Sequence, residues 1–228
     1  MVKISVIVCA KNEDKYIRTC LKALKNQIVK PEIIVIDGHS TDKTVKIAKK
    51  YADKVIRDNK KGVGAARNMG WRAASGDIMA YCDADSTPPK DWTKKIVENI
   101  KGHVAISGPL IAPGAREDIQ LQLSFWSNLV FRVANKFNQP IICGPNMAFP
   151  KKILKKYPFK VNVLEDVEIA HRLGKVGKVK YMESLRMPIS PRRYEKHLLE
   201  TILKHYARNY IRLKILRQMP TDWDYFKN

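Results

Sequence analysis

The chain has 228 residues, 45% of them hydrophobic, and 43 Lys and Arg against 22 Asp and Glu give a formal net charge of +21. This length and composition suit one compact globular unit, and they exclude a disordered, collagen-like or low-complexity protein. The charge predicts attraction to nucleic acid, anionic lipid or phosphorylated substrates, and a solvated Lys-rich surface explains it equally well.

The cysteines and the apolar runs bear on the compartment. Four cysteines contain no C-x-x-C pair, so we expect reduced thiols in the core. The sequence opens directly on a strand pattern instead of a signal peptide, and no apolar run is long enough to cross a bilayer. These features predict a cytoplasmic protein and leave open peripheral attachment to the cytoplasmic face of the membrane.

Short β-branched runs alternate with amphipathic stretches through the first half of the chain. The predicted strands are residues 4–10, 32–36, 54–57 and 78–82, and the predicted helices are 14–27, one ending near 51 and one ending near 74. This alternation predicts an α/β fold with a mainly parallel, Rossmann-like sheet flanked by helices.

Polar side chains follow three of the predicted strands. They are Asn12 and Glu13, then Asp37, then Asp83 and Asp85. Because ligands bind at the carboxyl ends of parallel strands, we expect these side chains to gather on one rim of the sheet. On an extended strand Asp83 and Asp85 share a face, where two hard oxygen ligands suit Mg²⁺ or Mn²⁺ and leave positions for phosphate oxygens. An exposed acidic turn is the commoner explanation of an isolated D-x-D, but the apolar strand before it favours the metal.

The loop after the second strand has two predicted roles. Asp37 would face the rim and accept hydrogen bonds from a base or a ribose. Ser40 or Thr41 would cap the helix that follows, where Asp42 also favours the helix dipole.

Arg67 and an acidic pair near residue 165 are further candidates. Arg67 lies in the glycine-bearing segment 62–70, which lacks the Gly-Lys-Ser/Thr of a P-loop. It either contacts phosphate or ribose or pairs structurally with one of the strand-end aspartates. Glu165 and Asp166 begin a predicted helix; their crowding can raise a carboxylate pKa, whereas the helix dipole alone also explains acids at this end.

The second half of the chain changes character near residue 112. We predict a donor-binding half at 1–112 and an acceptor-binding half at 113–228 within a single compact domain. The second half contains an aromatic stretch at 119–137, a strand at 141–149 and a basic amphipathic helix at 195–217. The aromatic residues 121–131 are either buried core or an exposed surface for a lipid-linked acceptor.

Five segments, taken in order, resemble the motifs of glycosyltransferase family 2, which has the GT-A fold. They are residues 6–13, 35–42, 65–68, 83–85 and 165–166. The resemblance covers about residues 3 to 174. It implies a donor site in which Ala10, Asn12 and Glu13 line the nucleotide and Asp37 holds the base or ribose. Asp83 would contact the ribose or the metal, and Asp85 would be the principal metal ligand. It also implies that Asp166, in the Glu165-Asp166 pair of the substrate site, is the catalytic base of an inverting transfer.

Residues 191–194 resemble the basic-aromatic segment that closes over the diphosphate. They depart from the Gln-x-x-Arg-Trp form of processive synthases, which favours a non-processive enzyme. Arg192 and Arg193 would stabilise the leaving group where negative charge grows; a surface basic cluster is the alternative.

The sequence therefore predicts a metal-dependent sugar transfer from a UDP- or GDP-linked donor to a hydroxyl or phosphate, on a lipid or glycolipid at a membrane surface. Lys204, Arg208 and Arg212 form a basic row that would meet anionic headgroups. A sugar-phosphate nucleotidyltransferase is disfavoured because the first loop lacks glycine. No nucleic-acid partner is expected, because RRM, KH and zinc-finger signatures are missing.

Overall fold

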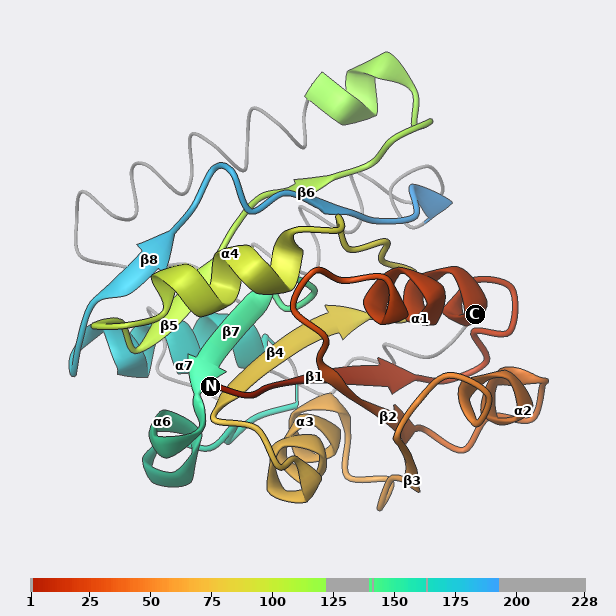
Figure 1. Cartoon of the computed structure of the whole chain (residues 1–228), viewed down its shortest axis with the longest axis horizontal. Coiled ribbons are helices and arrows are strands. Elements are labelled where there is room, and N and C mark those ends of the chain that lie inside the picture. Colours follow the sequence, from red (N-terminus) through yellow and green to blue (C-terminus); the bar gives the residue numbers. More distant parts are fainter. Residues whose placement is uncertain (1, 122–139, 141, 163, 193–228) are drawn as a thin grey trace.

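The computed structural model describes residues 2–121, 140, 142–162 and 164–192. Within them it confirms the α/β class, with a mostly parallel central sheet (Figure 1). The predicted basic helix at 195–217, the basic row on it, Arg193 and all of the aromatic stretch beyond residue 121 lie outside the described residues.

Within the described residues, seven strands form the sheet, in the order β3-β2-β1-β4-β7-β5-β8. Their bounds are β1 Ile4–Ala10, β2 Glu32–Asp37, β3 Lys54–Arg57, β4 Ile78–Asp83, β5 Ala105–Ser107, β7 Met147–Pro150 and β8 Val179–Tyr181. β7 runs antiparallel to both of its neighbours, β4 and β5, and the other pairings are parallel. A second, two-stranded sheet pairs β6 (Leu110–Ile111) with β9 (Met187–Pro188).

Helices cover both faces of the large sheet (Figure 1). Side chains of α1 (Ile17–Lys25), α2 (Thr44–Ala48) and α4 (Trp92–Asn99) contribute to one core cluster. Side chains of α3 (Val63–Ala73), α6 (Lys151–Lys156) and α7 (Glu165–Gly174) contribute to the other. A sheet covered on both faces needs continuous apolar strands, which is the pattern that the first half of the sequence has.

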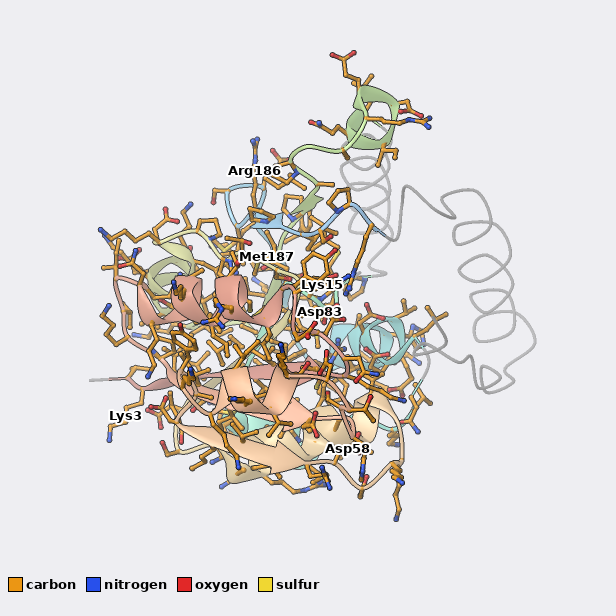
Figure 2. The ribbon with its side chains drawn as sticks, turned by 90° about the vertical axis from the view of Figure 1, so that its right-hand side faces the viewer. Lys3, Lys15, Asp58, Asp83, Arg186 and Met187 are labelled. Atoms are coloured by element: carbon orange, nitrogen blue, oxygen red, sulfur yellow. The ribbon has the colours of Figure 1, made fainter. Side chains whose placement is uncertain are left out.

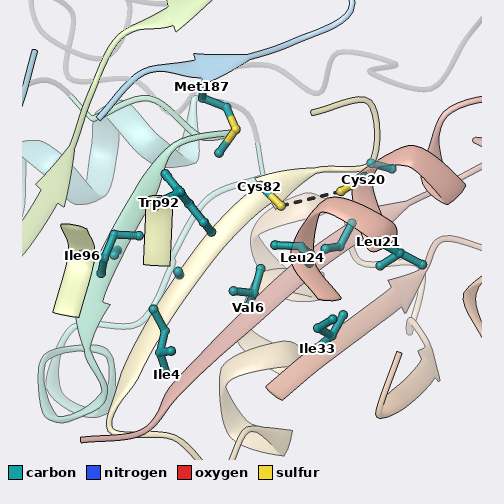
Figure 3. Close-up of a cluster of buried hydrophobic side chains, with 14 of the residues drawn as sticks. Ile4, Val6, Cys20, Leu21, Leu24, Ile33, Cys82, Trp92, Ile96 and Met187 are labelled. Carbon is teal, nitrogen blue, oxygen red and sulfur yellow. Dashed lines mark hydrogen bonds between the residues drawn. The ribbon is translucent and has the colours of Figure 1, made fainter. Parts of the chain in front are cut away.

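The alternation of side chains along β1 shows how one strand serves both cores. Val6 belongs with Leu24 of α1 to the cluster drawn in Figure 3, whereas Ile7 belongs with Trp71 of α3 to the cluster on the opposite face. Both strand residues are fully buried. Burying an aliphatic side chain of this size contributes about 1.5–3 kcal/mol, so the central strands form a rigid base for the residues at their ends.

Strand register aligns the ends of three strands. Ala10 pairs with Asp37 across β1 and β2, and Cys9 pairs with Asp83 across β1 and β4. The three carboxyl ends therefore stop at one level, where the sequence predicts the rim.

Three local predictions were wrong. The helix after β2 begins at Thr44 rather than next to Ser40 or Thr41, because the Ser40 hydroxyl accepts a hydrogen bond from the backbone N–H of Asn12 at 2.9 Å instead of capping. The first helix begins at Ile17, after a turn. Of the predicted strand 141–149, only the end becomes β7, because Cys143 and Asn146 close a tight turn before it.

The cysteines are free thiols. Cys20 of α1 and Cys82 of β4 are buried, with their sulfurs 3.9 Å apart (Figure 3). Strands from both sides of residue 112 share the large sheet, and the division of the chain at 112 stays a prediction.

Candidate functional site

The D-x-D segment lies at the end of β4, on the face of the molecule seen in Figure 2. Asp83 is the last residue of the strand, and a turn closed by a 3.0 Å hydrogen bond from the Ser86 N–H to the Asp83 carbonyl carries Asp85. Ala84 between them is buried. The prediction that the two carboxylates share a strand face is wrong because the chain has already turned at Asp85. The two carboxylates consequently take different cationic partners.

Arg67 is the partner of Asp83. Its side chain is 5% exposed, and its guanidinium forms an ion pair with Glu165 and lies 3.8 Å from the Asp83 carboxylate. The rings of Tyr81 and Phe159 lie about 6 Å from it. The structure shows the ion pair of Arg67 with a strand-end aspartate, and its contact with phosphate or ribose stays a prediction.

Glu165 and Asp166, adjacent in sequence, enter different environments. Glu165 is buried against Arg67, and its burial raises its pKa to about 7; Arg67 opposes this rise, whereas the charge of Asp166 adds to it. Asp166 is half-buried, and its Oδ2 accepts a hydrogen bond from the Gly144 N–H at 2.9 Å. One carboxylate is thus a structural partner of Arg67, and its neighbour is held by a backbone amide.

Gly144 is a residue that the sequence interpretation missed. A Cβ there would lie 2.9 Å from Nη2 of Arg67 and 3.2 Å from Oδ2 of Asp166. Only glycine leaves room for the guanidinium and the carboxylate on either side of this backbone. Its position before Pro145-Asn146, in a turn, was the available signal.

Arg192 is the partner of Asp85. Its Nε and Nη2 donate hydrogen bonds to Oδ2 of Asp85 at 3.2 and 3.0 Å, and Nη2 also reaches Oε1 of Glu13 at 2.5 Å. The guanidinium lies over the ring of Tyr16, 4.4 Å from its centroid. Tyr16 was not predicted as part of the site, and the turn that contains it carries no local sequence signal.

Asp37 faces the rim as predicted by its position. Its carboxylate is buried; Oδ1 accepts a hydrogen bond from the Ser40 N–H at 3.1 Å. Oδ2 has no hydrogen bond from the described residues, and Nε of Arg57 lies 3.8 Å away. A buried acceptor oxygen of this kind is suited to a hydroxyl or N–H of a ligand.

Asn12 and Ala10 shape the neighbouring loop. The Asn12 side-chain oxygen accepts a hydrogen bond from the Thr41 N–H at 2.9 Å, and Asn12 has a positive φ of 55°, which Asn tolerates better than most residues. Ala10 is buried, and its carbonyl accepts a 2.8 Å hydrogen bond from the Gly38 N–H. The side chain of Asn12 and the carbonyl of Ala10 therefore join the ends of β1 and β2.

The rim offers carboxylate oxygens to a divalent metal. The described residues hold no group of three or more acidic, His or Cys side chains placed to bind one. Mg²⁺ and Mn²⁺ are often held by one or two carboxylates completed by substrate phosphates and water. Asp85, whose carboxylate already attracts a cationic group, fits that arrangement as the protein ligand.

The Rossmann-like strand order and the acidic rim define a nucleotide-binding class of α/β protein. Residues 5–158 match the family described as glycosyl transferase family 2, and the chain belongs to this family.

Two curated relatives illustrate the similarity. The putative glycosyltransferase EpsH of Bacillus subtilis is 37% identical over 100 residues, which are 41% of this chain and 29% of EpsH. The dolichol-phosphate mannosyltransferase of Pyrococcus furiosus is 35% identical over 121 residues, 50% of this chain and 33% of that protein. The matches span about a third of the length of these relatives.

A solved structure with the same fold is the mannosyltransferase PcManGT from Pyrobaculum calidifontis, in complex with GDP-Man and Mn²⁺. It has a TM-score of 0.71 and 22% identity, and the match covers 95% of this chain and 62% of PcManGT. The predicted GT-A fold is confirmed by this likeness. No helix in the described part of the chain is long and apolar enough to cross a membrane.

Proposed function

We propose that the protein is a metal-dependent, inverting glycosyltransferase that uses a nucleotide-diphosphate sugar. The observation that carries the proposal is that residues from separate parts of a family 2 chain converge at the rim, where the carboxyl ends of the strands lie. Asp37 ends β2, Asp85 follows β4, and Asp166 lies on α7, where the Gly144 turn and Arg67 connect it to β4.

In the proposed reaction, Asp166 accepts the proton of the acceptor hydroxyl while that oxygen attacks the anomeric carbon. The new glycosidic bond forms as the bond from the anomeric carbon to the diphosphate oxygen breaks, so attack from the opposite face inverts the centre. When bound, the metal offsets the growing charge of the diphosphate, with Asp85 as its protein ligand. Asp37 receives the base or ribose through Oδ2, and Glu165 with Arg67 keeps α7 against β4.

The donor and metal classes are supported by the likeness to PcManGT, whose complex contains GDP-Man and Mn²⁺. We propose a UDP- or GDP-linked sugar, with Mn²⁺ or Mg²⁺. For the acceptor we propose a lipid hydroxyl or lipid phosphate, which the similarity to a dolichol-phosphate mannosyltransferase and the net charge of +21 support. Such an acceptor would place the protein on the cytoplasmic face of a membrane.

A thermal-shift screen tests the donor class. Nucleoside diphosphates and nucleotide sugars are added with and without Mn²⁺, and a bound ligand raises the unfolding temperature by mass action. We expect a selective shift that needs Mn²⁺. No shift with any nucleotide would contradict the proposal, and pyrophosphate release from a nucleoside triphosphate and a sugar phosphate would favour a nucleotidyltransferase instead.

A further inference from the structure

The guanidinium of Arg192 forms ion pairs with two carboxylates at the rim. It contacts Oδ2 of Asp85 through two nitrogens and Oε1 of Glu13 through one. The carboxylates are 9% and 13% exposed, whereas the Arg192 side chain is 30% exposed. Two poorly hydrated anions need counter-charge, and the Arg192 guanidinium contributes it to both.

Two features place Arg192 there. The backbone before it runs along the D-x-D turn, with hydrogen bonds from the Thr87 N–H to the Pro188 carbonyl at 2.8 Å and from the Ser190 N–H to the Asp85 carbonyl at 3.1 Å. The ring of Tyr16 then supports the guanidinium from below by a cation–π contact. The arrangement is therefore built by three separate segments of the chain.

A divalent metal on the Asp85 carboxylate would lie near the guanidinium that donates two hydrogen bonds to this carboxylate. Two cations on one carboxylate repel each other, so the metal and Arg192 would compete for it. A nucleoside diphosphate removes the conflict, because its oxygens complete the metal shell and offer the guanidinium new acceptors.

We infer that Arg192 is an internal counter-ion that opposes metal binding at Asp85 until a nucleoside diphosphate arrives and takes over the guanidinium. The inference rests on the proposed function, since it takes Asp85 as the metal ligand. Its consequence is a reciprocal coupling: the diphosphate increases the affinity for metal, and the metal increases the affinity for the diphosphate by the same factor. Arg192 contributes part of the coupling free energy between the metal and the diphosphate.

The test measures Mn²⁺ binding directly, from the electron paramagnetic resonance signal of free Mn²⁺, without an activity assay. Wild type, Arg192→Gln and Arg192→Lys are titrated with Mn²⁺ alone and with Mn²⁺ plus GDP or UDP. Without nucleotide, we expect Arg192→Gln to bind Mn²⁺ about tenfold more tightly than wild type, the factor expected from losing charged hydrogen bonds. Arg192→Lys, which keeps the charge, should stay close to wild type, and the nucleotide should enhance Mn²⁺ binding less in Arg192→Gln than in wild type.

Arg18→Gln is the matched control. Arg18 is exposed, lies two positions after Tyr16 and contacts the hydroxyl of Tyr51 rather than a carboxylate. The control removes the same charge from the same region, and its Mn²⁺ affinity should equal that of wild type. Circular dichroism confirms that each variant is folded.

The two proposals fail differently. If Asp85→Asn abolishes Mn²⁺ binding and Arg192→Gln binds Mn²⁺ alone no more tightly than wild type, the counter-ion inference is wrong and the metal site stands. If Mn²⁺ binds Asp85→Asn as it binds wild type, or binds neither with any nucleotide, the proposed metal site is wrong and the inference falls with it.

Discussion

Arg67 and Glu165 form a buried ion pair although 98 positions separate them in the chain. Arg67 is on α3, beside β1 and β2, and Glu165 is the first residue of α7. The pair ties the start of α7 to the part of the sheet that carries Asp83. Because Asp166 follows Glu165 directly, this ion pair also determines where the proposed base lies.

The first prediction concerns stability and pH at Glu165. Its pKa is about 7 in the folded protein against an ordinary value of 4.5, so between these values the folded state holds a proton that the unfolded state has lost. Glu165 therefore contributes stability that is lost as the pH rises from about 4.5 to about 7, on the order of 3 kcal/mol in all. Urea unfolding of wild type and Glu165→Gln across this range should show a steeper decline for wild type.

Glu165→Gln should come close to the stability of wild type at low pH, where both side chains are uncharged, and should lack the decline of wild type as the pH rises. Glu98→Gln is the control, since Glu98 is exposed and pairs with Lys94 on one helix. Parallel stability curves for wild type and Glu165→Gln would show that Glu165 has an ordinary pKa.

The second prediction concerns the proposed base. Asp166→Asn should lower kcat by about 10²–10⁴-fold, the usual contribution of a general base, and leave donor affinity close to wild type. Steady-state kinetics and calorimetric titration with the nucleotide sugar measure the two quantities separately. Glu168→Gln, which removes a carboxylate paired with Arg172 on the same helix, should retain activity. Normal turnover in Asp166→Asn would exclude the role of base.

The third prediction concerns the metal ligand. Asp85→Asn should remove the Mn²⁺-dependent part of nucleoside diphosphate binding, because the amide carries no charge to hold the ion. Calorimetric titration of GDP or UDP with and without Mn²⁺ measures it. Asp91→Asn is the control, since Asp91 is half-buried and pairs with Lys95 at 2.8 Å. Equal Mn²⁺ enhancement in both variants would show that Asp85 is not the ligand.

The fourth prediction concerns Gly144. In Gly144→Ala the new methyl group displaces Asp166 or Arg67, so kcat should fall by up to about a hundredfold, as expected for a displacement approaching 1 Å at a reacting group. Gly114→Ala is the comparison, because its backbone has a φ of +81° with open space around the position. That variant should lose about 1 kcal/mol of stability through backbone strain and keep its kcat. Equal kcat for Gly144→Ala and wild type would remove Gly144 from the site.

The local pattern of apolar and polar residues was enough to predict the main strands of the sheet and the position of the rim. The strands at 4–10, 32–36 and 78–82 were predicted close to their observed bounds, because a strand buried on both faces must be apolar throughout. Helix starts were less predictable. Ser40 is of a residue type that often caps helices, but its hydroxyl accepts a hydrogen bond from the Asn12 N–H in another loop.

The sequence by itself determined the α/β class, the row of strand ends that carries Asp37 and Asp83, and the resemblance to the family. Only the tertiary structure decided that Arg67 joins Glu165, that Gly144 holds Asp166, and that Arg192 lies between Asp85 and Glu13. The physical reason is the separation in sequence between the residues that interact. Periodicity records which face of an element is buried, whereas the partner of a charged side chain depends on which distant segments the packed sheet brings within hydrogen-bond distance.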